Sequence, residues 1–210
     1  MSKGQQTRAT IVSEAMRAAS VEGFQGISIG MLAERLKMSK SGLFAHFGSK
    51  EELEKAVLDE AADRFAAMVW QPALQAPRGR PRIEALFHNM LDWMLHNRDL
   101  PGGCIFMALS VEMDDKPGPV RDDLAEMQTR WQATVARSAQ IAVQEGHFRA
   151  DLDPRQFAFD MQGIMMAMSY YRRLLKDPSA VQRAEAAFAD LLARSAAAPA
   201  AIETAPLRSL

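Results

Sequence analysis

Ser28 to Phe47 reads SIGMLAERLKMSKSGLFAHF, and this stretch decides the fold. Serine is a preferred N-cap, so Ser28 predicts a short helix through Leu36, and Ser39 predicts a second one through about His46. Two short helices joined by a tight turn form a helix-turn-helix. In such a motif the N-terminal side chains of the second helix are free to enter the major groove of DNA.

The apolar residues of the same stretch explain how the two helices would pack. Leu32, Leu36 and Leu43 supply apolar contacts, and Ala33 is small enough to let the helices cross closely. Met38 would fill the space under the turn between them. The pattern therefore predicts a packed pair of helices and not an exposed loop.

The neighbouring segments also predict helices. Upstream, a helix from about Gln6 to Val21 would end at Gly23, where a left-handed residue is tolerated. Downstream, Ser49 would cap a helix that runs to Gln71, because Pro72 opposes its continuation.

The rest of the chain has apolar residues at helical spacing and no alternating run long enough to indicate a sheet. Five further helices are expected, at about 83–94, 104–111, 120–144, 154–175 and 178–197. The predicted fold is all-α, with an N-terminal three-helix helix-turn-helix domain and a larger helical ligand-binding and dimerisation domain. We expect the first domain at 1–50, the second at 51–200, and a disordered tail at 201–210.

Composition excludes several classes of protein. Apolar residues make up 48% of the 210 residues, enough for a buried core. No apolar run approaches the ~20 residues needed to cross a bilayer, and the N-terminus lacks the apolar region of a signal peptide. Cys104 is the single cysteine, so no internal disulfide or cysteine-based metal site is expected. We expect a cytoplasmic protein that has no metal, no cofactor and no membrane partner.

Charge is distributed unevenly along the chain. Residues 1–50 hold seven Lys or Arg and three acidic residues, a net charge of +4, whereas the whole chain has a net charge of −1. The remainder is therefore strongly acidic, at −5. This asymmetry favours a polyanion partner for the N-terminal part alone, although chance fluctuation over fifty residues is an alternative explanation.

Several residue pairs surround the motif in a fixed order. Gly23-Phe24 and Ser28-Ile29 come first, Leu43-Phe44 follows, and Phe47 to Leu53 reads FGSKEEL. In this order the stretch from Thr7 to Val57 resembles the TetR/AcrR family of bacterial regulators, which have an F-x-S-K-E-x-L signature after the helix-turn-helix. The resemblance implies a DNA reader fused to a helical domain that dimerises and senses a ligand.

Three positions depart from the family pattern. Lys37 stands where the turn usually has Gly, at a cost of about 1 kcal/mol if the residue is left-handed. Gly42 stands in place of Thr or Ala, and Phe44 in place of a phosphate-contacting Tyr. Gly42 has no side chain to read a base, and Phe44 is limited to apolar contact with a sugar or a thymine methyl.

The resemblance also indicates which residues would contact DNA. Lysine at the start of the recognition helix can donate to guanine or neutralise a phosphate, and a helix N-terminus can bind a phosphate. The predicted DNA-binding residues are Ser28, Lys40, Ser41, Gly42, Phe44, His46 and Lys50. Solvated charge is the alternative for the two lysines, and packing near Phe47 is the alternative for His46.

Ten of the fourteen methionines lie beyond residue 60. Methionine adapts its shape, so these residues and nearby aromatic rings could line an apolar cavity, although simple core filling is the alternative for any one of them. The predicted lining residues are Phe87, Met90, Met94, Phe106, Met107, Met127, Trp131, Met165 and Tyr170. The candidate polar anchors for a ligand are His88, Asp160, Gln162 and Tyr170.

By the same resemblance, the last two long helices pair with their copies to form a homodimer. A C2 dimer would place two recognition helices on one face of a near-palindromic double-stranded DNA operator. We expect a sequence-specific repressor that a small, largely apolar effector releases from DNA, although an activator would share these features. A helical protein-binding adaptor is a second hypothesis. A small helical enzyme is a third, which the absence of recognisable catalytic motifs disfavours.

Overall fold

The computed structural model describes residues 2–198 and confirms the predicted all-α fold. The elements in chain order are α1 (Lys3–Gly26), α2 (Ile29–Arg35), α3 (Lys40–Phe44), α4 (Lys50–Phe65), the π-helix η1 (Ala66–Trp70), α5 (Gln71–Leu74), α6 (Arg80–His96), α7 (Ile105–Met113), α8 (Pro119–Gln144), α9 (Pro154–Arg173) and α10 (Ala180–Ser195). We call α1–α3 the head and α4–α10 the body. The predicted tail at 201–210 lies outside the described residues.

The head is a helix-turn-helix held by serine caps. Ser28 Oγ accepts from the Met31 amide at 3.2 Å, and Ser39 Oγ accepts from the Gly42 amide at 3.0 Å. Both predicted caps are therefore confirmed. Between them Lys37 is left-handed, with φ of 54°, so the expected strain at this turn is present.

α1 is longer at both ends than the prediction of 6–21. It begins at Lys3, because Ser2 and Gln5 form a capping box that was not identified from the sequence. At the other end Gly23 is non-helical, with φ of 69°, and one more turn follows to Gly26. The prediction that the chain leaves the helical path at Gly23 is confirmed.

The helix that begins after Ser49 was predicted to end at Gln71. This end is wrong, because the helical path continues through Pro72 to Leu74. The reason is the π-helix η1, at whose end the Gln71 amide donates to the carbonyl of Ala66. This wider turn shifts the hydrogen-bond register by one residue just before the proline. Pro72 then lies in the first turn of α5, where its missing N–H matters least.

The five remaining helices of the body occur where they were expected, with altered ends. α6 runs from Arg80 to His96 and so exceeds the predicted 83–94 at both ends, and α7 extends to Met113 instead of Val111. α9 and α10 end within two residues of their predicted limits. α8 ends at Gln144 as predicted, and Gly146, with φ of 73°, lies just beyond this end.

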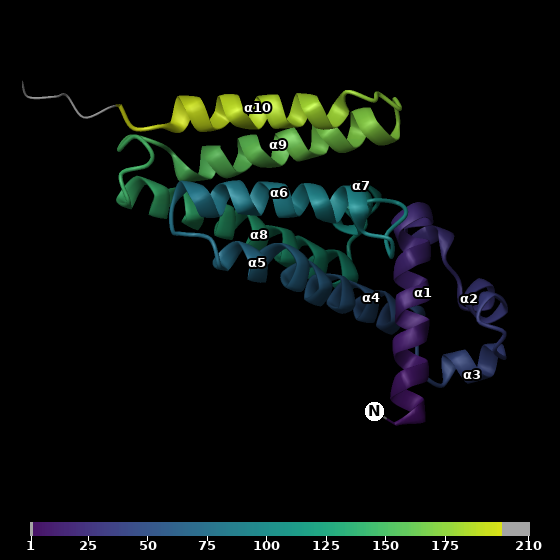
Figure 1. The fold of residues 1–210 in the computed structure, drawn as a ribbon. Helices are drawn as coiled ribbons and strands as arrows, with labels where there is room; N and C mark the ends of the chain where they lie inside the picture. The colour runs from purple at the N-terminus through teal and green to yellow at the C-terminus, as the bar shows by residue number, and fades with distance from the viewer. Residues whose placement is uncertain (1, 199–210) are drawn as a thin grey trace, which may run out of the picture.

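Figure 1 shows α1 lying across one end of the body, whose long helices run side by side away from it. α4 begins against the head and extends under the body, so no flexible linker separates the two parts. One continuous set of buried apolar residues extends from the head, with Phe24 and Phe47, into the body, with Trp93 and Phe157. The division of the chain after residue 50 stays a prediction, because α4 belongs to both packing environments.

Candidate DNA reader and ligand cavity

The recognition helix α3 presents a small exposed surface. Lys40, Ser41 and Phe44 are exposed, and Phe44 leaves 50% of its surface to solvent. A Cβ at Gly42 would lie 2.9 Å from Ser39 Oγ, so glycine gives room to the N-cap. The absence of a side chain at position 42 therefore also has a local structural cause.

Lys40 extends back toward α2. A Cβ added to Gly30 would come within 3.2 Å of Lys40 Cε, so the lysine stem passes close to the first turn of α2. This turn begins at Ser28, which is exposed. Three of the predicted DNA-binding residues, Ser28, Lys40 and Ser41, therefore lie on one exposed side of the head.

Lys50 has partners within the protein. Its Nζ donates to the backbone carbonyl of Phe24 at 2.7 Å and lies 3.5 Å from Glu54 Oε1. Burial raises the pKa of the Glu54 carboxyl, and the positive charge of Lys50 opposes that shift. Lys50 thus joins α4 to the end of α1, and its contact with DNA stays a prediction. His46 is half-buried and directly precedes the buried Phe47, and both interpretations of this residue stay predictions.

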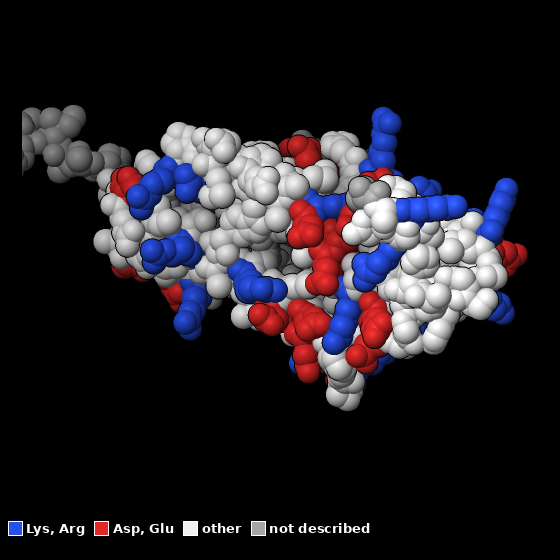
Figure 2. Space-filling view, turned by 90° about the horizontal axis from the view of Figure 1, so that it is seen from below, with Lys and Arg blue, Asp and Glu red and all other residues white. Residues whose placement is uncertain are grey.

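Arg8 is a basic residue near the reader that sequence reasoning missed. Its guanidinium lies over the Phe47 ring, 4.7 Å from the centroid. Arg8 precedes the motif by twenty residues, so the spacing of the motif gave no signal for it. Figure 2 shows Lys and Arg side chains projecting from the end that carries α2 and α3, while acidic side chains gather near α4.

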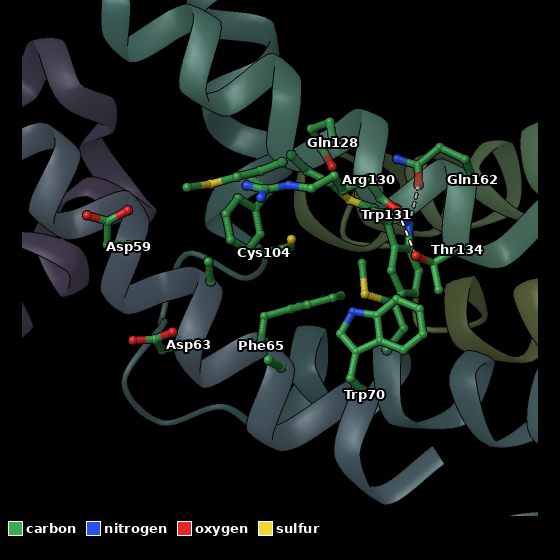
Figure 3. A pocket seen from close by; sticks show the side chains of 16 residues that line it. Asp59, Asp63, Phe65, Trp70, Cys104, Gln128, Arg130, Trp131, Thr134 and Gln162 are labelled. Atoms are coloured by element: carbon green, nitrogen blue, oxygen red, sulfur yellow. Dashed lines mark hydrogen bonds between the residues drawn. The ribbon is translucent and has the colours of Figure 1, made fainter. Parts of the chain in front are cut away.

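A cavity of about 680 Å³ lies in the body between α4, η1, α6, α7, α8 and α9. It is lined mainly by aromatic, sulfur-containing and small side chains, with polar groups at its edges (Figure 3). Its lining residues are Asp59, Ala62, Asp63, Phe65, Ala66, Trp70, Met90, Cys104, Phe106, Met107, Met127, Gln128, Arg130, Trp131, Thr134 and Gln162. The volume suits a ligand of drug-like size.

The structure brings together five of the nine predicted lining residues, namely Met90, Phe106, Met107, Met127 and Trp131. The other four do not line this cavity. Phe87 stacks on Phe188 with ring centroids 3.7 Å apart, and Met94 and Met165 are buried elsewhere in the core. Tyr170 is 52% exposed on α9. Helical spacing identifies the buried face of a helix, but it does not reveal which part of that face borders a void.

Sequence reasoning missed the two aromatic rings contributed by α4 and η1. Phe65 meets Trp131 edge-on at 5.1 Å between centroids, and Trp70 meets the same indole at 5.5 Å. Figure 3 shows these three side chains pointing into one space. Residues five apart lie on one side of a helix only if its turn is wide, and η1 provides that turn.

Gln162 is the one candidate polar anchor that lines the cavity. Its Oε1 accepts from Trp131 Nε1 at 3.3 Å and from Gln132 Nε2 at 3.1 Å. These two bonds fix the amide, so its NH₂ group is available as a donor. The other anchors are engaged elsewhere or exposed: Asp160 pairs with Arg194 at 2.6 Å, and His88 Nδ1 bonds the carbonyl of Glu84.

Cys104 forms part of the cavity wall and is 4% exposed. Burial raises the pKa of its thiol, so the sulfur is held in its neutral form. Among residues 2–198, no cluster of His, Cys, Asp and Glu is arranged to hold a metal ion. Within the same range, no helix combines the length and apolar character needed to span a bilayer.

Comparisons with known proteins agree with this geometry. The sequence model of the family described as bacterial regulatory proteins, tetR family, matches residues 11–57. The family model described as tetracyclin repressor-like, C-terminal domain, matches residues 79–188. The HTH-type transcriptional regulator TcmR of Streptomyces glaucescens is 29% identical over 191 residues, covering 85% of this chain and 79% of that protein.

Solved structures show the same fold. A TetR transcriptional regulator from Chloroflexus aurantiacus has a TM-score of 0.78 and 25% identity, covering 92% of this chain and 96% of its own. AibR, solved with isovaleryl coenzyme A and operator DNA, has a TM-score of 0.73 and 19% identity, covering 90% of this chain and 98% of its own. The C-terminal model alone spans more than half of the chain. The chain therefore belongs to the TetR family and is a non-enzymatic, DNA-binding transcriptional regulator.

Proposed function

We propose that the protein is a repressor that leaves its operator when a small, largely apolar ligand occupies the body cavity. The observation that carries this proposal is the path of α4. It starts at Lys50 against the head, and its continuation reaches Phe65 and Trp70 in the cavity wall. A ligand that prefers one position of this helix would favour one position of the head, and operator affinity would change by the differential affinity.

For the DNA contacts we propose Lys40, Ser41 and the N-terminus of α2 at Ser28, with apolar contact from Phe44. Arg8 is added because its guanidinium lies on the same small domain, stacked on Phe47. Lys50 is assigned to the head–body joint, since its ammonium already bonds the Phe24 carbonyl.

We further propose a C2 homodimer through α9 and α10. Large apolar side chains are exposed on α9, including Phe159 at 71% and Met166 at 50%, and Leu174 at its C-cap is 67% exposed. Such a patch is unusual on a monomer's surface and indicates an association site. Two heads related by a two-fold axis would read a near-palindromic operator.

Fluorescence anisotropy tests DNA binding. Purified protein is titrated into DNA selected from a random pool and into shuffled DNA, each at two salt concentrations. Selected DNA should bind more tightly, with strong salt dependence. Lys40→Ala should weaken binding and reduce the salt slope by about 1, whereas Arg137→Ala, which removes an exposed cation of α8 in the body, should change neither. Equal affinity for selected and shuffled DNA contradicts the proposal.

Ligand release is tested by intrinsic fluorescence. Two of the three tryptophans, Trp70 and Trp131, line the cavity, and Trp93 contacts Phe65 with ring centroids 5.4 Å apart. Compounds that quench this fluorescence are added to the preformed complex with selected DNA. The proposal expects that some of them lower operator affinity. If every cavity-binding compound leaves operator affinity unchanged, the ligand-controlled part is wrong.

A further inference from the structure

Residues 97–113, which we call the connecting segment, contact both the cavity and the head. Three of its side chains, Cys104, Phe106 and Met107, form one wall of the cavity. They lie just before or within the first turn of α7, and Glu112 lies at the other end of this nine-residue helix. α7 therefore spans the distance between the proposed ligand site and the head.

Both carboxylate oxygens of Glu112 accept hydrogen bonds from the end of α1. Oε2 accepts from the Phe24 amide at 2.8 Å, and Oε1 accepts from the Gln25 amide at 2.9 Å. The carboxylate is only 17% exposed, and Lys116 Nζ is the nearby cation at 3.5 Å. Hydrogen bonds to a charged, partly buried group are about twice as strong as neutral ones.

The backbone of α1 is shaped for this contact. Gly23 has φ of 69°, and a Cβ at this position would overlap Glu112 Oε2. Glycine thus both permits the left-handed kink and leaves space for the carboxylate. The carbonyl of Phe24, whose amide bonds Glu112, accepts from Lys50 of α4. One peptide segment of the head is therefore held by α7 and α4 together.

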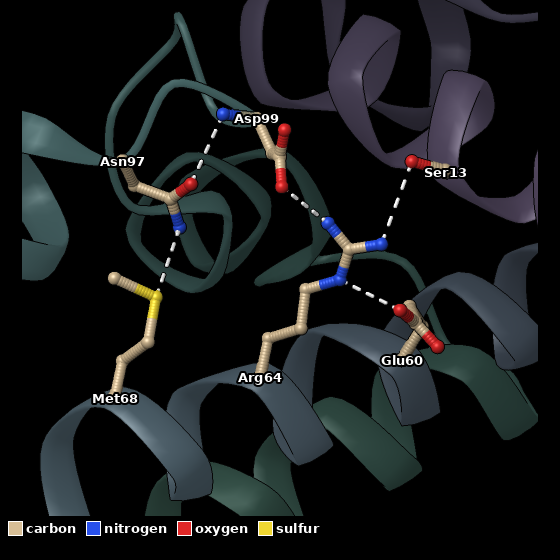
Figure 4. A network of polar contacts seen from close by, with 6 residues as sticks. All are labelled: Ser13, Glu60, Arg64, Met68, Asn97 and Asp99. Carbon is tan, nitrogen blue, oxygen red and sulfur yellow. Dashed lines mark hydrogen bonds and ion pairs between the residues drawn. The ribbon is translucent and has the colours of Figure 1, made fainter.

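Two further contacts join the connecting segment to the head. The Gly102 amide donates to Ser20 Oγ at 3.1 Å, and a Cβ at Gly102 would overlap the backbone carbonyl of Ser20. Arg64 of α4 reaches Asp99 at 2.7 Å and Ser13 Oγ at 3.4 Å (Figure 4). The segment is thus attached near three places along α1.

We propose that Glu112 is a positioning residue that transmits the state of the cavity to the DNA reader. The inference rests on the proposed function and specifies its route. A ligand that displaces Phe106 or Met107 shifts the start of α7, and a short rigid helix carries the shift to Glu112. The carboxylate then pulls on, or releases, the Phe24 and Gln25 amides, and the head changes its angle on the body. α7 is thus a second route beside α4.

The first experiment measures what Glu112 does without a ligand. Glu112→Ala removes both bonds and should weaken binding to selected operator DNA about tenfold, because two charge-assisted bonds fix the head. Glu112→Gln preserves shape and can accept one bond, so partial rescue is expected. Glu145→Ala, which removes an exposed body carboxylate, is the matched control. Wild-type operator affinity in folded Glu112→Ala overturns the positioning role.

The second experiment measures transmission. The neutral dye Nile red serves as a cavity probe, and Ala66→Trp serves as an occupant built into the cavity wall. Ala67→Trp, on an exposed position of the same π-helix, is its control. In the wild-type background, dye or Ala66→Trp should lower operator affinity about fivefold or more. In the Glu112→Ala background the same additions should have a clearly smaller effect.

The outcomes separate the two proposals. If neither the dye nor Ala66→Trp affects operator binding by the wild type, the ligand-controlled function fails, while the first experiment still decides the positioning role. If both act equally with and without Glu112, ligand control stands and the route through Glu112 is wrong. Gly23→Ala provides the check from the head side: its effect should be smaller in the Glu112→Ala background, where the overlap with the carboxylate is gone and only the backbone strain at Gly23 remains.

Discussion

At the residue scale, Phe44 is the side chain in which this regulator departs most visibly from the family pattern. It is half-exposed on the recognition helix, so its removal should not disturb the fold. Phe44→Ala should weaken operator binding about fourfold, the equivalent of one buried methylene or ~0.8 kcal/mol. Anisotropy with selected DNA measures this change. Phe44→Tyr restores a hydroxyl, and a gain in affinity for all DNA sequences would show that position 44 faces a phosphate and not a base.

The thiol of Cys104 provides a second prediction at this scale. Since burial raises its pKa, less thiolate is present at a given pH than for a free cysteine, and the neutral form persists as pH rises. Labelling by Ellman's reagent at pH 8 should be slow in the native protein and fast in urea. Ligands that fill the cavity should slow the labelling of the native protein further, because Cys104 lines the cavity wall. Rapid native labelling would contradict the buried position.

Individual residues differ in how well sequence alone identifies them. Ser28 and Ser39 were predictable as caps, because their role depends on neighbours three residues away. Glu112 was not predictable, since its partners Phe24 and Gln25 are 88 and 87 residues distant in the chain. Lys50 is a different case: its place in the family signature was readable from the sequence, but its bond to the Phe24 carbonyl, 26 residues away, was not. Sequence patterns therefore identify hydrogen bonds between residues a few positions apart, but not those between distant segments.

At the element scale, the turn between α2 and α3 is strained at Lys37. Glycine adopts a φ of 54° without the steric penalty of a side chain, so Lys37→Gly should raise the free energy of unfolding by up to ~1 kcal/mol. Urea unfolding followed by circular dichroism measures this change in the free energy of unfolding. Lys55→Gly, within α4, should lower stability by about the same amount and serves as the opposite control. A destabilised Lys37→Gly would mean that the lysine side chain contributes more than its strain.

The helices themselves were predictable and several of their ends were not. Apolar spacing placed every long helix, since that spacing reflects the buried face. The helix end predicted before Pro72 was wrong, because a π-turn precedes the proline and lets the helical path continue. Hydrophobic spacing does not reveal such a change in hydrogen-bond register. Phe65 and Trp70 were missing from the predicted cavity lining for the same reason, since residues five apart share one side of a helix only in such a turn.

At the scale of the whole molecule, the exposed apolar side of α9 predicts self-association. Leu174→Glu, at a position 67% exposed, should shift the protein toward monomer in analytical ultracentrifugation and weaken operator binding by the loss of the second head. Leu74→Glu, at a position 53% exposed on α5, should leave association unchanged. A wild-type protein that is monomeric at micromolar concentration would remove the basis for two-fold operator recognition.

The π-helix between Phe65 and Gln71 has a consequence for how this chain tolerates insertions and deletions. A π-turn contains one residue more than the α-turn it replaces, so Ala66–Trp70 behaves as a single inserted residue. Deleting Ala67, which is exposed, would return the segment to α-helical register. Phe65 and Trp70 would then be four residues apart, and four residues of an α-helix turn through about 400°, so both rings would stay on the same face. Trp70 would keep facing the cavity, whereas Pro72 would fall within an uninterrupted α-helix, where proline removes a hydrogen bond and clashes with the preceding turn. The inserted residue therefore serves the proline and not the ring, and its loss should cost stability before it costs the cavity.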